Sequence, residues 1–150
     1  MKKREWQISS KAYGDYAVSL CTTYFLSQGF RVLKPHCDRG HYDLVVEKDG
    51  KFQRVQCKRT RAISKPQGYF RVSLQVKGFR RKEDGRIVRG AIHTYTKQDF
   101  DLLWVVTPPS CYLIPLSDIL GDRETKTDLK LTPRWDKYKV DIPMPPDIHS

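Results

Sequence analysis

A tight-turn signal constrains this sequence more than any other feature. Asp49 and Gly50 stand between two runs of β-forming residues, 42–47 and 52–58. An Asp-Gly pair favours a primed two-residue turn, whose twist matches that of the strands it joins. The sequence therefore predicts a β-hairpin in which directly opposed residues have numbers that add up to 99, as 48 and 51 do.

This register brings three polar side chains together. Asp43 falls opposite Gln56, and Lys58 lies diagonally across from Asp43 on the face that carries Gln56. A carboxylate, an amide and an ammonium around one point suit a divalent cation and a phosphodiester, because Mg²⁺ prefers oxygen ligands. By spacing alone, a salt-linked surface hairpin explains the same pattern. The opposite face can enter a core through Leu44, Val55 and Cys57.

If the hairpin is a hydrolytic site, its residues have distinct roles. Asp43 and the backbone carbonyl of Cys57 would hold Mg²⁺, for which Mn²⁺ is expected to substitute. Gln56 would add a weaker neutral oxygen or position water. Lys58 would orient and polarise the attacking water, while the metal supplies electrophilic stabilisation.

The positive charge is concentrated in one stretch. The net charge is +11, and twelve basic but only two acidic residues lie between Arg54 and Arg89, whereas residues 121–150 are balanced. This asymmetry favours a nucleic-acid partner, because each cation that neutralises a phosphate releases counterions; taken alone, a solvated basic face is the alternative. The predicted DNA contacts are Arg59, Arg61, Lys65, Arg71, Gln75, Lys77, Arg80, Arg81, Lys82, Arg86 and Arg89.

The rest of the chain predicts one domain over residues 1–129 and an extended Pro-rich arm over 130–150. Apolar residues at intervals of three and four predict a helix that begins at Ser9 or Ser10 and ends near Gly29. The other predicted elements are strands over 30–33, 69–76, 87–93, 100–106 and 111–116 and a short helix from Ser117. Residues 71–89 predict a basic β-ribbon that could read base edges in a DNA groove.

The four cysteines form no CxxC pair, so we expect reduced thiols. His36, Cys37 and His41 match no tetrahedral ligand spacing, and zinc is not predicted there. No apolar stretch approaches the roughly 18 residues of a membrane span, and the N-terminal stretch lacks a signal-peptide core. We therefore expect a cytoplasmic protein without membrane contact.

The stretch YDLVVEKDGKFQRVQCKRT (42–60), with the helix beginning KAYGDYAV, resembles the PD-(D/E)XK nuclease superfamily. The order of elements up to CYLIPLSDI is similar to the bacterial group that contains cyanobacterial group I intron homing endonucleases. The resemblance implies an α/β fold with a restriction-endonuclease-like core, a mixed central β-sheet flanked by helices, and a basic β-ribbon insertion. It assigns the motif's Asp to Asp43, its second acidic position to Gln56 and its Lys to Lys58.

Two departures from the family pattern are visible. Tyr42 replaces the name-giving Pro, and Gln56 replaces a carboxylate, which weakens the metal affinity. Asp15 falls where the first helix often carries Glu and could compensate catalytically, although an acidic residue near a helix N-terminus is also favoured by the helix dipole.

The resemblance implies a Mg²⁺-dependent, sequence-specific homing endonuclease that cuts double-stranded DNA and is encoded in an intron. Cutting both strands needs two active sites, so a homo-oligomer, dimer or tetramer, is expected. The alternatives are a structure-selective junction resolvase or repair nuclease and a DNA-binding module that has lost catalysis. Gln56 favours the module, whereas intact Asp43 and Lys58 oppose it.

Overall fold

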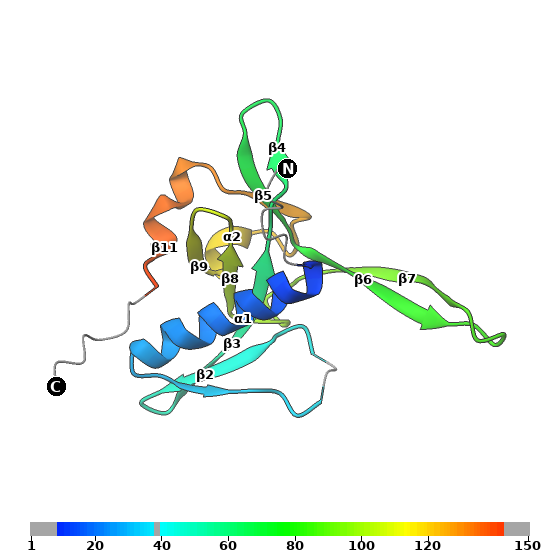
Figure 1. Cartoon of the computed structure of the whole chain (residues 1–150), viewed down its shortest axis with the longest axis horizontal. Coiled ribbons are helices and arrows are strands. Elements are labelled where there is room, and N and C mark those ends of the chain that lie inside the picture. Colours follow the sequence, from blue (N-terminus) through cyan, green and yellow to red (C-terminus); the bar gives the residue numbers. More distant parts are fainter. Residues whose placement is uncertain (1–8, 38–39, 143–150) are drawn as a thin grey trace, which may run out of the picture.

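The computed structural model describes residues 9–37 and 40–142, which form an α/β fold around a six-stranded mixed sheet (Figure 1). The strand order is β1-β2-β3-β8-β9-β11, and all neighbours are antiparallel except β3 and β8, which are parallel. The bounds are β1 (Arg31–Leu33), β2 (Leu44–Lys48), β3 (Lys51–Arg59), β8 (Leu102–Val106), β9 (Cys111–Pro115) and β11 (Lys139–Val140).

The predicted hairpin is β2 and β3, in the predicted register. Leu44 pairs with Val55 and Lys48 with Lys51, so paired numbers add up to 99. Asp49 and Gly50 both have positive φ, 53° and 79°, as a primed turn requires. The turn is closed by Gly50, whose N–H donates to Oε1 of Glu47 at 2.9 Å.

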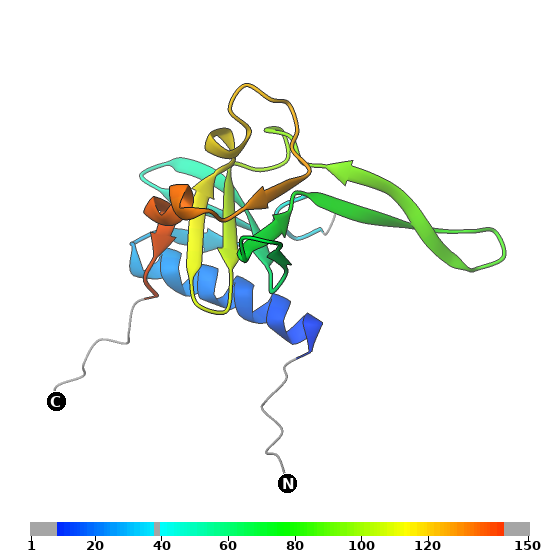
Figure 2. The same cartoon turned by 90° about the horizontal axis from the view of Figure 1, so that it is seen from above.

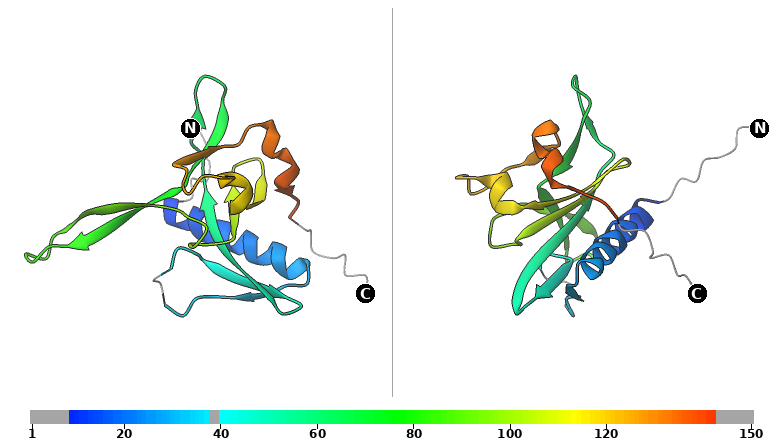
Figure 3. Two further views of the ribbon diagram at one scale, coloured as in Figure 1. Left: turned by 180° about the vertical axis from the view of Figure 1, so that it is seen from behind. Right: turned by 90° about the vertical axis from the view of Figure 1, so that its left-hand side faces the viewer.

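Helix α1 (Ser10–Ser27) covers one face of the sheet, and Ala12 N donates to the N-cap side chain of Ser9 at 3.1 Å. Figure 3 shows α1 on one side of the sheet, with α2 (Leu116–Leu120) and the 3-10 helix η1 (Pro133–Tyr138) on the other. The core is accordingly divided in two by the sheet. The α1 side buries Tyr13, Ala17, Cys21 and Phe25 against Leu44, Val55, Cys57 and Trp104, and the other side buries Tyr95, Phe100, Leu103, Val105 and Ile114.

The crossover from β3 to β8 contains a long β-ribbon. Strands β6 (Gln75–Arg81) and β7 (Ile87–Thr94) pair with one another and project from the body (Figures 1 and 2). The strand predicted over 69–76 is divided at Leu74, because that residue is buried and bonds to Thr127 and Tyr95 instead. Strand β5 (Tyr69–Ser73) pairs with β4 (Ile63–Ser64) and β10 (Asp128–Lys130).

The predicted extended arm is wrong for residues 130–142. Leu131 and Trp135 are buried in the core on the α2 side, and β11 adds to the edge of the central sheet beside β9. Burial of these apolar side chains overrides the breaking effect of Pro133, which occupies the first turn of η1, where proline is tolerated. Residues 143–150 lie outside the described part of the chain. None of the helices among the described residues is long and apolar enough to cross a membrane.

Candidate active site

Asp43 directly precedes β2 and is held against the middle of β3. Its N–H donates to the Val55 carbonyl at 2.9 Å, so the regular pairing ends at Leu44 and Asp43 does not sit squarely opposite Gln56. Its carboxylate Oδ2 instead accepts the Cys57 N–H at 2.9 Å. A side-chain oxygen thus replaces a main-chain carbonyl in the ladder, and the carboxylate lies beside the segment 56–58.

Lys58 lies on the face of β3 opposite to α1. Its Nζ is 5.1 Å from the centre of the Tyr95 ring, which is 1% exposed. Burial lowers the pKa of Lys58, while the negative charge of Asp43 raises it and the positive charge of Arg59 lowers it. Burial raises the pKa of Tyr95 to about 12, with smaller contributions from Asp43 and Asp99. The charge of Asp43 therefore acts on both Lys58 and Tyr95.

Gln56 and Cys57 follow the predicted alternation of faces. Gln56 is half-buried, whereas Val55 and Cys57 are buried against α1. The pKa of the Cys57 thiol is raised well above its ordinary value by a hydrogen bond with Cys21, by burial and by Asp43. The thiol is therefore neutral and buried in the core on the α1 side.

Asp15 lies apart from this arrangement. It is exposed on α1, two residues after Tyr13, which faces the sheet. Helix α1 covers the face of the sheet opposite to Lys58, and the pattern of burial turns Asp15 away from the sheet.

A groove of about 480 Å³ lies beside Lys58, along the end of β3, the end of β5 and the start of β6. The hydroxyl of Thr60 donates to the Arg71 carbonyl at 2.7 Å, and this hydrogen bond joins the end of β3 to β5 in the wall of the groove. The groove is lined by Lys58, Arg59, Thr60, Ala62, Arg71, Val72, Ser73, Gln75, Thr127 and Asp128. It therefore joins Lys58 to three of the predicted DNA contacts, Arg59, Arg71 and Gln75.

The first predicted DNA contacts are partly engaged within the protein. Arg59 donates from Nε to the Ser10 carbonyl at 2.9 Å, and Arg61 stacks on the Tyr13 ring at 4.6 Å. Arg71 Nε lies 3.7 Å from Asp128 Oδ2, while Lys65 is exposed next to the turn between β4 and β5. Arg59 and Arg61 thus flank the end of β3 on its α1 side.

The ribbon carries most of the remaining predicted contacts. Gln75 at its base donates to the Thr94 hydroxyl at 3.0 Å. Arg86 near the tip donates to Asp84 at 2.6 Å, and the Arg80 side chain lies outside the described part of the molecule. The exposed basic side chains of the ribbon and its turn are Lys77, Arg81, Lys82, Arg86 and Arg89. The structure therefore places a row of cations on an element that projects from the body (Figure 2).

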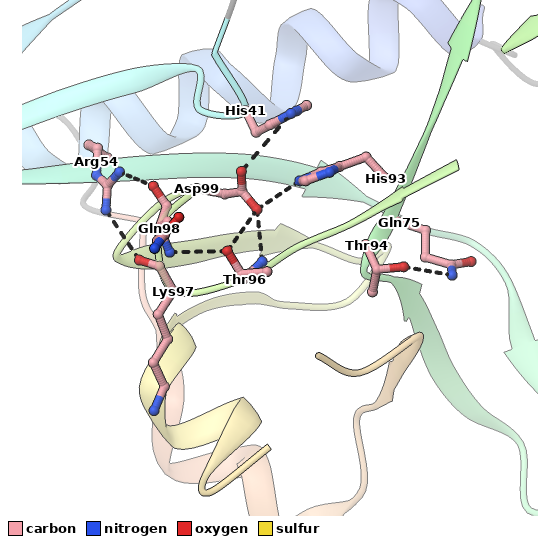
Figure 4. Close-up of polar contacts among 9 residues, drawn as sticks. All are labelled: His41, Arg54, Gln75, His93, Thr94, Thr96, Lys97, Gln98 and Asp99. Carbon is pink, nitrogen blue, oxygen red and sulfur yellow. Dashed lines mark hydrogen bonds and ion pairs between the residues drawn. The ribbon is translucent and has the colours of Figure 1, made fainter. Parts of the chain in front are cut away.

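A second polar cluster, of His41, His93 and Asp99, was not predicted (Figure 4). Tyr95 adjoins it, with ring centres 6.0 Å from His41 and 6.2 Å from His93. The rings of His41 and His93 stack at 4.2 Å with an interplanar angle of 9°. His93 Nε2 lies 2.8 Å from Asp99 Oδ2, and His41 Nε2 lies 4.0 Å from Asp99 Oδ1. His41 comes from a segment 52 residues before His93, whereas His93 and Asp99 are only six residues apart, so the sequence spacing did not indicate this cluster.

The loop that carries Asp99 is fixed from two sides. Burial alone would raise the pKa of Asp99, but hydrogen bonds from Thr96 N and His93, with the charges of both histidines, hold it below its usual value. Two residues on, Asp101 accepts the Arg54 N–H at 2.7 Å and Nη2 at 3.1 Å. Arg54 also donates to the carbonyls of residues 97 and 98, which ties the loop to β3 (Figure 4).

Comparison with known proteins places this arrangement in a family. A sequence model described as "PD-(D/E)XK endonuclease" matches residues 8–142. A solved structure, that of the bacterial homing endonuclease I-Ssp6803I, is similar with a TM-score of 0.65 and 26% identity, over 88% of this chain and 89% of that one. No curated protein sequence matches.

Proposed function

Since the chain belongs to the PD-(D/E)XK endonuclease family, we propose that it is a homing endonuclease that hydrolyses double-stranded DNA at a specific sequence, with Mg²⁺, and that it is encoded in an intron. The restriction-endonuclease-like fold and the nuclease assignment follow from the family match and the structural neighbour. The observation that carries the catalytic proposal is the Asp43 carboxylate, which is held on the N–H of Cys57 beside Lys58.

The donors at this site fit a hard divalent cation. Asp43 offers a carboxylate, Cys57 its backbone carbonyl and Gln56 an amide oxygen, while the neutral Cys57 thiol is directed into the core. Mg²⁺ takes oxygen ligands and keeps several waters, and Mn²⁺ accepts the same oxygen donors. When bound, the cation would polarise the scissile phosphate. A single carboxylate in this set implies weaker metal binding than a pair would give.

Lys58 is the residue that we assign to the attacking water. Its ammonium is placed by the Tyr95 ring and balanced by the charge of Asp43, so it can donate to water or to a non-bridging phosphate oxygen. Asp15 is left out of the proposed site, because it lies on the exposed side of α1.

The groove and the ribbon supply the proposed DNA surface. The groove leads from Lys58 past Arg71 and Gln75, and β6 and β7 continue from its rim. A two-stranded ribbon fits the major groove of B-DNA, where Arg and Gln side chains can read base edges. A symmetric assembly of two or more chains would provide a second active site for the second strand.

The substrate experiment separates this proposal from its two alternatives. Full-length protein is incubated with a plasmid that carries a candidate intron-insertion site, with a random plasmid and with a four-way junction, each in Mg²⁺ and in EDTA. We expect discrete cleavage of the first plasmid in Mg²⁺ alone. Cleavage of only the junction would indicate a resolvase, and tight binding without cleavage in Mg²⁺ or Mn²⁺ would indicate a binding module.

A further inference from the structure

We propose that His41, His93 and Asp99 form a binding site for a transition-metal cation of the Zn²⁺ class, separate from the proposed Mg²⁺ site. Two imidazole nitrogens and one carboxylate oxygen are the donors that Zn²⁺ takes, whereas Mg²⁺ prefers oxygen alone. The three ligand atoms lie within 4.8 Å of one another. The molecule would thus hold two cations of different chemical class.

The carboxylate is oriented for this role. Asp99 is 12% exposed at its side chain, and its Oδ2 accepts the Thr96 N–H at 2.7 Å as well as contacting His93. A backbone donor of this kind fixes the direction of a metal-binding carboxylate, as the hydrogen-bond partners of metal ligands commonly do. Oδ1 is the oxygen turned toward His41. Among the described residues, the ion-pair partners of Asp99 are the two histidines, and no lysine or arginine forms an ion pair with it.

Small movements of the two histidines would bring the ligand atoms to the distances found around a bound cation. Ligand atoms around a tetrahedral Zn²⁺, at about 2.0–2.1 Å from the metal, lie roughly 3.3 Å apart. His93 Nε2 is already closer than this to Asp99 Oδ2, at 2.8 Å, and His41 Nε2 is 4.0 Å from Oδ1. Both histidine side chains are partly exposed, at 37% and 42%. They can rotate out of the stacked arrangement, His93 slightly away from Oδ2 and His41 toward Oδ1, while solvent fills a fourth position.

The position of the cluster connects the ribbon to the active site. His93 is in β7 at the base of the ribbon, and His41 lies two residues before Asp43. The Tyr95 ring, on which Lys58 rests, is 6.0 Å from His41 and 6.2 Å from His93 between ring centres. A cation here would tie the base of the ribbon to the segment that presents Asp43.

The test is metal binding by tag-free full-length protein without DNA. Zn²⁺ is titrated calorimetrically in excess Mg²⁺, and Co²⁺ is titrated as a probe whose visible absorption reports nitrogen and oxygen ligands. We expect one equivalent per chain and a melting temperature that rises with Zn²⁺, as binding to the native state requires. His41→Ala and His93→Ala should each weaken binding by at least about 10-fold, the lower range for loss of even a hydrogen-bond partner of a metal ligand.

Three controls locate the ion. His36→Ala and Cys37→Ser alter other side chains that can bind metals, and they should leave the Zn²⁺ affinity unchanged. Asp43→Asn should also bind Zn²⁺, because it affects only the proposed Mg²⁺ site. If the wild-type protein fails to bind one equivalent of Zn²⁺, the proposal is overturned, whatever the variants do. Uptake that survives both histidine substitutions in folded protein, or that is lost in His36→Ala, would overturn it as well.

Discussion

At the scale of single residues, the site depends on how β3 divides its side chains between the two faces of the sheet. Val55 and Cys57 are buried against α1, which turns Gln56 and Lys58 to the other face. There the Tyr95 ring supports the Lys58 ammonium, and Asp43 offsets the effect of burial on its charge. In the proposed site Tyr95 is a positioning residue for Lys58, and the linear sequence does not reveal it because it lies 37 residues beyond Lys58.

Tyr95 is tested by changing the ring and the hydroxyl separately. Tyr95→Phe keeps the ring beneath Lys58 and should leave the cleavage rate near wild type. Tyr95→Leu removes the cation–π contact, worth about 0.5–2 kcal/mol, and should lower kcat by roughly 2- to 30-fold at unchanged DNA affinity. Single-turnover cleavage with saturating enzyme measures this, and equal rates for the two variants would refute the role.

Asp101 provides a pH-dependent stability test. Burial alone would raise the pKa of Asp101, but the bonds and charge of Arg54 lower it below its usual value. The folded state therefore binds protons less readily than the unfolded chain, and this stabilisation is present above the unfolded pKa of about 3.9 and is lost as pH falls through the folded pKa.

Asp101→Asn should therefore be less stable than wild type at neutral pH and should lose less stability on acidification below about pH 5. Urea unfolding midpoints from neutral pH to pH 3 measure the difference. Asp122→Asn, an exposed carboxylate after α2, serves as the control. Parallel pH curves for Asp101→Asn and wild type would contradict the assignment.

At the scale of elements, the sequence predicted the local turn but not which residues far apart along the chain are buried together. The Asp49-Gly50 turn predicted the β2–β3 register correctly, because a two-residue loop leaves one way to pair the strands. The sequence could not reveal that Leu131 and Trp135 insert into the core, since their partners lie far away along the chain. The His41, His93 and Asp99 cluster was missed for the same reason.

The ribbon should contribute DNA affinity rather than chemistry. Replacing exposed Arg81 and Lys82 by Gln removes two cations from β6 and the turn that follows it. Binding should weaken, and the slope of log K against log salt should become shallower by about one for each phosphate that the protein no longer neutralises. The same replacement at exposed Lys34 and Lys51, outside the ribbon, is the matched control.

Fluorescence anisotropy at several salt concentrations measures the affinity, and single-turnover cleavage measures the chemical step. A reduced chemical rate at saturating enzyme, with an unaltered salt slope, would contradict the proposed role of the ribbon.

At the scale of the whole molecule, three parts have distinct proposed duties. The central sheet positions the active site, the groove of about 480 Å³ leads DNA away from Lys58, and the ribbon extends the contact beyond the body (Figure 2). One active site per chain serves one strand, so we propose that the working nuclease is a symmetric oligomer. Nicked product would then accumulate only when assembly is incomplete.

The most direct test of the central claim is single-turnover cleavage by Asp43→Asn and Lys58→Ala, with DNA affinity measured in the same buffer. We predict that both variants lose nearly all cleavage and keep wild-type affinity to within a few-fold, because neither side chain supplies most of the phosphate contacts. Asp49→Asn and Lys51→Ala, which make the same changes elsewhere on the hairpin, should cut normally. Undiminished cleavage by Asp43→Asn or Lys58→Ala would contradict the account.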